Sequence, residues 1–158
     1  MKPFLLKIIY ANVLVIAFAA PLLLSACGGG DEPQPPTKVE EVTTLLTANG
    51  GSWTPALSSG VTIDGVDVTD DLFSGFSITF RENTFTTTGT SPVWLREDTW
   101  RFKDENADVI IRGQDDKEIT IREISATQLL LTLEWTVTTT EGGRQGSLKG
   151  KHEFILNK

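Results

Sequence analysis

The sequence has only one cysteine, Cys27, and only one histidine, His152, among its 158 residues. A single cysteine excludes an intramolecular disulfide, and any Ser-His-Asp or Cys-His catalytic site would have to use His152. Positive charge is also scarce, since 14 Lys and Arg stand against 21 Asp and Glu. An acidic surface repels phosphate groups, which argues against nucleic-acid binding. These scarcities favour a disulfide-free, non-enzymatic protein that needs no cofactor.

The one long apolar run lies near the N-terminus and is organised as an export signal. Lys2 and Lys7 precede the almost entirely apolar segment 8–24, and small residues follow it. About 17 apolar residues could also cross a bilayer as a retained transmembrane helix. Pro21 would interrupt such a helix, and no positively charged residues follow it directly. We therefore expect residues 1–26 to be a signal peptide.

Residues 24–27, Leu-Ser-Ala-Cys, resemble a bacterial lipobox. The resemblance implies cleavage after Ala26, thioether lipidation of Cys27 and acylation of the new N-terminus. Several acyl chains together anchor a protein stably to a membrane. By the same kind of resemblance, Gly28 after the cysteine fits retention in the outer membrane. The lipid anchor, and through it the membrane, is thus the first expected partner.

Removal of residues 1–26 leaves 132 residues, which suit one domain. The remaining chain has 12 Lys and Arg against 21 Asp and Glu, a formal charge of −9. Residues 27–37 contain three glycines and three prolines, and this composition is typical of a tether. Residues 38–158 form the expected domain.

The hydrophobic period changes once along this domain. Val39, Val42, Leu45 and Leu46 lie at helical spacing and are followed by Asn49-Gly50-Gly51, which predicts one short helix over 38–48. After that the apolar residues recur at every second position. The predicted strands are 52–56, 61–68 with a hairpin turn at 64–65, 75–80, 84–88, 97–103, 107–112, 117–124, 128–139 and 147–156.

This pattern predicts an all-β fold, an antiparallel meander of eight to nine strands preceded by one short helix. Tight turns without helix-length connections fit either a sandwich or a closed barrel. Closure removes both unpaired edges of a long meander. We therefore expect the barrel.

The tripeptide Gly51-Ser52-Trp53, behind a helix and ahead of a meander, resembles the G-x-W signature of the lipocalins. The segments that carry a closer resemblance, to the lipocalin-like lipoproteins of Bacteroidota, are 73–80, 92–94, 99–102, 142–144 and 150–154. The resemblance covers about residues 45–158 and implies a small barrel with a cavity for an apolar or amphipathic ligand. In that family an Arg of the last strand packs on the signature Trp, whereas here the strand offers only Lys149 and Lys151.

Six side chains that alternation turns inward are the candidate lining of such a cavity. They are Phe80, Asp98, Trp100, Phe102, Trp135 and His152. Asp98 and His152 could act together as orienting group and base. The ordinary alternative, which we favour, is a buried histidine satisfied by one carboxylate or backbone group.

Two further features have a functional and an ordinary interpretation. The carboxylates of Asp64, Asp67, Asp70 and Asp71 could share a Ca²⁺, but acids in turns more commonly accept backbone N–H bonds. Trp94 follows Pro92 in an expected loop and is a candidate surface contact for a sugar or a partner protein. Its alternative role is to cap one end of the barrel.

These observations predict a non-enzymatic, outer-membrane lipoprotein that binds a small apolar or amphipathic ligand within or at the mouth of its barrel. The alternative is a surface interaction module that binds a glycan or a protein through its loops. An eight-stranded barrel can be filled by its own side chains, and such filling would favour the alternative.

Overall fold

The computed structural model of this protein describes residues 34–136, 139–141, 144–146 and 148–158. The signal segment, Cys27 and most of the tether lie outside these residues, so the expectations for them stay predictions. Within the described residues, no helix combines the length and the apolar character that a membrane crossing requires.

The predicted helix is present as α1 (Lys38–Thr47). Thr37 caps it, because its hydroxyl accepts the Glu40 N–H at 3.2 Å while the Glu40 carboxylate accepts the Thr37 N–H at 2.7 Å. A short 3₁₀ turn, η1 (Ala48–Gly51), follows, and Asn49 and Gly50 take positive φ angles there. The chain leaves the helix where the sequence predicts that it stops.

Each predicted strand segment contains a strand. The bounds are β1 (Ser52–Pro55), β2 (Val61–Ile63), β3 (Val66–Asp67), β4 (Ser77–Phe80), β5 (Thr84–Thr88), β6 (Glu97–Phe102), β7 (Val109–Arg112), β8 (Glu118–Ile124), β9 (Gln128–Trp135), β10 (Thr139–Glu141), β11 (Arg144–Gly146) and β12 (Gly150–Asn157). Alternation did not predict the one-turn helix α2 (Thr69–Leu72), nor that the last long hairpin continues beyond β9 into the separate β10–β11 pair.

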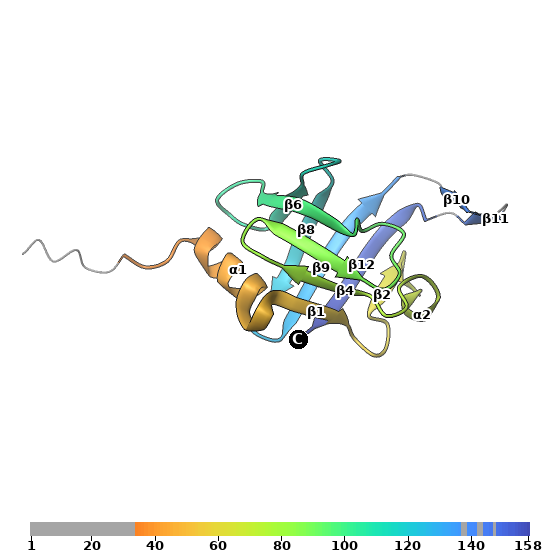
Figure 1. The fold of residues 1–158 in the computed structure, drawn as a ribbon, viewed down its shortest axis with the longest axis horizontal. Coiled ribbons are helices and arrows are strands. Elements are labelled where there is room, and N and C mark those ends of the chain that lie inside the picture. The colour runs from red at the N-terminus through yellow and green to blue at the C-terminus, as the bar shows by residue number, and fades with distance from the viewer. Residues whose placement is uncertain (1–33, 137–138, 142–143, 147) are drawn as a thin grey trace, which may run out of the picture. The chain divides into compact units, whose positions relative to one another are not determined.

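Eight of the described strands form a closed antiparallel barrel in the order β1-β4-β5-β6-β7-β8-β9-β12 (Figure 1). Closure occurs at β1, where Trp53 is opposite Ile78 of β4 and Pro55 is opposite Leu156 of β12. Beyond β1, the same edge of β12 pairs with β2, which continues into β3. The predicted barrel is therefore confirmed over the sandwich.

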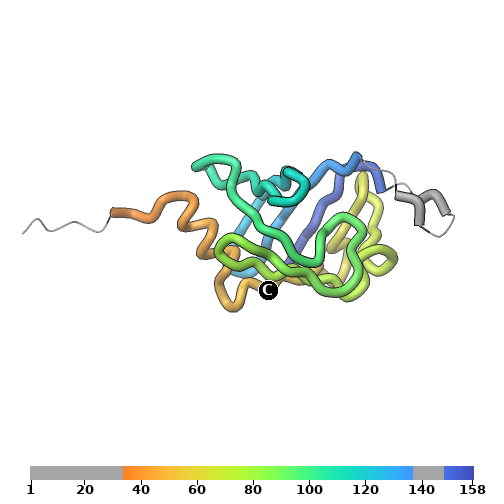
Figure 2. The backbone as a smooth tube through the Cα atoms, turned by 45° about the horizontal axis from the view of Figure 1, so that its top comes forward, coloured from red at the N-terminus to blue at the C-terminus, as the bar shows by residue number. Residues whose placement is uncertain are grey.

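The two ends of the barrel are covered differently (Figure 1, Figure 2). Helix α1 lies over one end, the helix end, and places Val42 and Leu46 in the core. The opposite end, called the mouth here, carries α2 and the loop 89–96. Phe73, directly after α2, and Trp94 of that loop are both buried.

Aromatic rings fill the space between the two ends. Their centroids lie 5.8 Å apart for Phe80 and Trp100, 5.4 Å for Phe85 and Trp94, 5.8 Å for Trp94 and Phe154, and 5.3 Å for Phe154 and Phe73. Edge-to-face angles of 79–89° give these four contacts the geometry that aromatic rings prefer. The Phe80 and Phe85 rings, 6.3 Å apart, complete the connection from the helix end to the mouth. The barrel is therefore a packed core.

Candidate functional site

Trp53 is fixed at the helix end by Lys158, which follows β12. Trp53 is fully buried and its indole N–H donates to Leu46 O at 3.0 Å. The Lys158 ammonium lies 4.5 Å from the centre of the Trp53 ring and donates to Leu45 O and Ala48 O at 2.9 and 2.8 Å. Partial burial lowers the pKa of Lys158. The cation on Trp53 is thus Lys158, which the sequence analysis did not single out.

Trp94 does not present its ring to solvent. It is 5% exposed and packs against Phe76, Phe85 and Phe154. The Ser91 hydroxyl accepts the Trp94 backbone N–H at 2.9 Å, which turns the loop inward after Pro92. The prediction of an exposed contact at Trp94 is wrong, because burial of the indole outweighs its position in a loop. Its burial favours the capping role.

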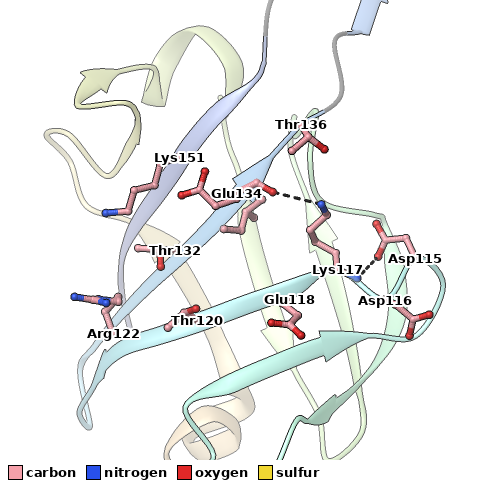
Figure 3. A pocket seen from close by; sticks show the side chains of 11 residues that line it. Asp115, Asp116, Lys117, Glu118, Thr120, Arg122, Thr132, Glu134, Thr136 and Lys151 are labelled. Atoms are coloured by element: carbon pink, nitrogen blue, oxygen red, sulfur yellow. Dashed lines mark hydrogen bonds between the residues drawn. The ribbon is translucent and has the colours of Figure 1, made fainter.

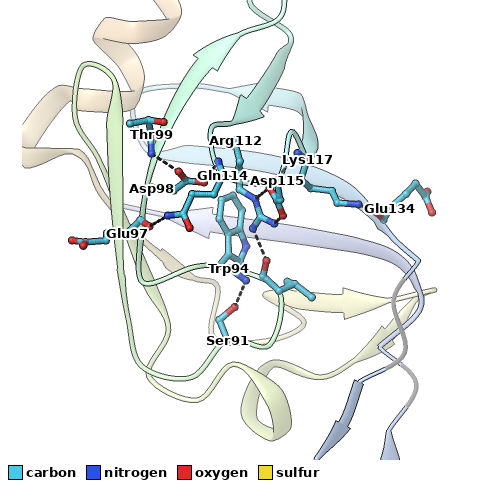
Figure 4. Close-up of polar contacts among 11 residues, drawn as sticks. Ser91, Trp94, Glu97, Asp98, Thr99, Arg112, Gln114, Asp115, Lys117 and Glu134 are labelled. Atoms are coloured by element: carbon cyan, nitrogen blue, oxygen red, sulfur yellow. Dashed lines mark hydrogen bonds and ion pairs between the residues drawn. The ribbon is translucent and has the colours of Figure 1, made fainter.

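A buried arginine holds this loop over the mouth (Figure 4). Arg112, fully buried at the end of β7, donates to Val93 O at 2.6 Å and pairs through two nitrogens with the Asp115 carboxylate. Its guanidinium lies 5.8 Å from the ring centres of both Trp94 and Trp135. Desolvation acts to raise the pKa of Asp115, but the hydrogen bonds and charge of Arg112 outweigh it and keep this pKa below its ordinary value.

Sequence reasoning did not single out Arg112. Alternation says which face of a strand a residue occupies, but Arg112 is the last residue of its strand, where the periodicity ends. The available signal was its spacing to Asp115, three residues on across a turn, which suits an ion pair.

The six candidate cavity residues do not meet around one cavity. Phe80, Asp98, Trp100 and His152 are buried, and Phe102 and Trp135 are half-buried. Trp100 and Phe102 line a groove beside α1, and Asp98 lines a different one, of about 500 Å³, between β5 and the turn after β7. The prediction of a shared internal cavity is not supported, because aromatic rings occupy the interior.

Asp98 and His152 are bonded to different backbone groups. The Asp98 carboxylate accepts the N–H groups of Thr99 and Gln114 at 2.7 and 3.2 Å. His152 Nε2 lies 2.7 Å from Leu148 O, so Nε2 carries the proton and donates it. Burial lowers the pKa of His152, although the hydrogen bond to Leu148 and the nearby Asp64 and Glu134 charges act to raise it. Among the described residues, His152 thus contacts a backbone carbonyl through Nε2, not Asp98, and its buried Nδ1 has no hydrogen-bond partner.

Two members of the cluster of aspartates at 64–71, Asp64 and Asp67, likewise accept hydrogen bonds from backbone N–H groups. Asp67 accepts the N–H groups of Ser59 and Thr69, each at 3.0 Å, and Asp64 accepts the Lys151 N–H at 2.9 Å. The side-chain and backbone hydrogen bonds from Thr69 lower the pKa of Asp67. Across the described part of the chain, no three His, Cys, Asp or Glu side chains are arranged to hold a metal ion. Asp67 thus supports the chain that leads into α2, and Asp64 connects the β2–β3 turn to β12.

Two open grooves on the barrel differ in chemistry. The helix groove, of about 490 Å³, is lined by Val39, Glu40, Thr43, Thr44, Glu82, Asn83, Trp100, Arg101 and Phe102. The threonine groove, of about 610 Å³, lies over β8, β9 and β12 and is lined by Asp115, Asp116, Lys117, Glu118, Thr120, Arg122, Thr132, Leu133, Glu134, Thr136 and Lys151 (Figure 3). The first has an aromatic wall, and all lining residues of the second except Leu133 are polar or charged.

Comparisons of this chain with protein-family models, with curated proteins and with solved structures find no match.

Proposed function

We propose that this protein is a non-enzymatic lipoprotein of the bacterial outer membrane, anchored through Cys27, that binds a small amphipathic ligand in the helix groove. The observation that carries the proposal is the pair of aromatic rings, Trp100 and Phe102, which forms one wall of a groove open to solvent. The lipocalin-like resemblance of the sequence points to the same ligand class.

The wall of the helix groove is rigid. The Trp100 indole N–H lies 3.0 and 3.1 Å from Arg81 O and Thr84 O, which fixes the ring. Phe102 stands edge-to-face against it, with centroids 5.0 Å apart at 83°. Half-buried Val39 of α1 faces this wall from the helix side of the groove. A preformed apolar strip of this kind suits the hydrocarbon part of a ligand.

Polar groups surround this strip. Glu40, Glu82 and Arg101 line the groove with exposed side chains, and Thr43 and Thr44 add hydroxyls. A wholly apolar molecule would leave these groups without partners, whereas an amphipathic one can place its head group among them. The lining therefore favours an amphipathic ligand over a hydrocarbon.

The expected tether places the groove within reach of such molecules. Thr37, the N-cap of α1, is ten positions after Cys27, and a fully extended chain over ten steps spans at most about 36 Å. Val39 of the groove follows two residues later. Lipidation at Cys27 would keep the groove near the membrane surface, where amphipathic molecules concentrate.

The packed interior directs this ligand to the helix groove. Within the barrel Phe154 contacts Phe73, Phe76 and Trp94, and entry of a ligand would require these rings to separate. The helix groove requires no such rearrangement, so binding there has the lower energetic cost.

The proposal can be tested on Pro35–Lys158, which forms one compact unit. Native mass spectrometry and tryptophan fluorescence would follow titration with fatty acids, lysophospholipids and sterols. At least one amphipathic class should bind, and Phe102→Ala should weaken it tenfold or more, because about 1.5–3 kcal/mol of apolar contact is lost. The matched control is Val66→Ala, which shortens an exposed apolar side chain outside the helix groove and should leave binding unchanged. Absence of binding by all three classes, or equal binding by Phe102→Ala, would refute the proposal.

A further inference from the structure

We propose that the threonine groove is a second binding site, and that its ligand is a neutral, polyhydroxylated molecule, a segment of a carbohydrate chain. The site is separate from the helix groove and shares no residue with it. It therefore does not depend on the function proposed above.

The groove forms where β8 and β9 diverge. Their registered pairing toward the mouth ends at Thr120 opposite Thr132, so Glu118 and Glu134 are not paired across the two strands. Lys117 crosses the gap, and its ammonium donates to Glu134 O at 3.3 Å (Figure 3). The inward-facing residue Leu133 becomes part of the lining. A groove of about 610 Å³ is within the range that small ligands occupy.

The residue types of the lining favour polar ligands over hydrocarbons. Leu133 is its only apolar residue, and the others carry hydroxyl, carboxylate, ammonium or guanidinium groups. A hydrocarbon in the groove would separate these groups from water without replacing their hydrogen bonds, which is unfavourable. The ligand must therefore itself be rich in hydrogen-bonding groups.

The charges in the groove nearly cancel. Three of the lining residues are neutralised by ion pairs, namely Asp115 by Arg112, Glu118 by Lys103 and Lys151 by Glu153. The remaining charges are two acids, Asp116 and Glu134, and two bases, Lys117 and Arg122. A groove without net charge selects neither polyanions nor polycations. The ligand is thus neutral as well as polar.

Much of the hydrogen-bonding capacity of the lining is free for a ligand. Within the described part of the chain, the Thr120 and Thr132 hydroxyls, the Glu134 carboxylate and the Arg122 guanidinium have no hydrogen-bond partner. Hydroxyls both donate and accept, carboxylates accept and guanidinium donates. Sugar hydroxyls also both donate and accept, so they can form hydrogen bonds with the hydroxyl, carboxylate and guanidinium groups of the groove. These groups belong to two neighbouring strands of the barrel, β8 and β9, which set their backbone positions.

The test uses the full chain in a polyoxyethylene detergent, which carries no sugar. Isothermal titration would be run with neutral tetra- to hexasaccharides of glucose, xylose and N-acetylglucosamine, and with uronic-acid and sulfated oligosaccharides for comparison. At least one neutral oligosaccharide should bind, and its affinity should be unchanged between 50 and 500 mM NaCl.

Two variants remove groove contacts without disturbing the core. Thr132→Val should lower the affinity about two- to tenfold and Arg122→Met about tenfold or more. The matched controls Thr79→Val and Arg96→Met, which lie outside the groove, should bind as the unmodified chain does. Phe102→Ala should also bind sugar normally, so failure of this proposal can be distinguished from failure of the proposed function.

The opposite results would overturn the inference. The inference fails if no neutral oligosaccharide binds, or if both groove variants bind as the unmodified chain does. It also fails if only charged oligosaccharides bind and salt abolishes that binding, or if the groove binds only a protein partner.

Discussion

Asp115→Ala should destabilise the protein more than the double change Arg112→Met, Asp115→Ala. The reason is the unequal burial of the two partners, since the Arg112 side chain is 1% exposed and that of Asp115 is 36% exposed. Removal of the carboxylate leaves a buried guanidinium that keeps one hydrogen bond, to Val93 O. Removal of both charges leaves no buried ion, and the methionine keeps an apolar side chain between the two indole rings.

The structure sets the size of this difference. An uncompensated buried charge costs about 3–5 kcal/mol, so Asp115→Ala should lower the free energy of unfolding by that amount. Arg112→Met leaves Val93 O without its partner, which costs about 1–3 kcal/mol, while water can hydrate the partly exposed Asp115. The double variant should lose about 1–3 kcal/mol as well. It should therefore be about 2 kcal/mol more stable than Asp115→Ala alone.

Urea unfolding followed by tryptophan fluorescence and far-ultraviolet circular dichroism would measure all four members of this cycle. With a slope of about 1–2 kcal/mol per molar urea, the double variant should unfold about 1–2 M later than Asp115→Ala. If the two single losses simply add in the double variant, Arg112 and Asp115 are not coupled and the reasoning is wrong.

Three further changes test other parts of the structure. Lys158→Ala should lower the free energy of unfolding in urea by about 1–3 kcal/mol, because the Trp53 ring loses its cation and two carbonyls lose a donor; an unchanged midpoint would contradict this. Burial lowers the pKa of His152 below 6.5, so below that pH the unfolded chain binds a proton that the folded chain does not. As the pH falls below 6.5, the free energy of unfolding should therefore decrease by up to about 1.4 kcal/mol per pH unit, until the pH reaches the pKa of His152 in the folded protein. His152→Gln, compared with the unmodified chain between pH 8 and 4, should lack this pH-dependent decrease. Trp94→Ala should cost about 3–5 kcal/mol in thermal unfolding, whereas an exposed surface contact would cost almost nothing.

The sequence predicted the elements well because local signals determine them. The helical spacing of apolar residues over 39–46 predicted α1, and the Asn49-Gly50-Gly51 run predicted its end. Alternation over β5 and β9 reflects strands with one buried and one exposed face. These signals depend on neighbours a few residues apart, so they can be read without knowledge of the rest of the fold. Helix α2 escaped detection because four residues are too few to show a period.

The site was predicted less well because alternation cannot say what lies opposite an inward-facing residue. It placed Phe80, Trp100 and His152 inside correctly, but only the three-dimensional arrangement shows that rings fill the space they face. Trp94 was misjudged for the same reason, since the Phe85 and Phe154 rings that bury it belong to distant strands.

By itself, the sequence determined the order of helix and strands, the antiparallel meander and the inward or outward face of most strand residues, because these follow from periodicity and turn chemistry within short segments. Tertiary structure alone decided the register of β1 against β12, the position of Lys158 over Trp53, the burial of Arg112 and the divergence of β8 from β9. Each of these depends on groups brought together by folding, and a contact such as that between Thr54 and Asn157 spans 103 residues of chain. The grooves proposed to bind ligands arise from such long-range contacts.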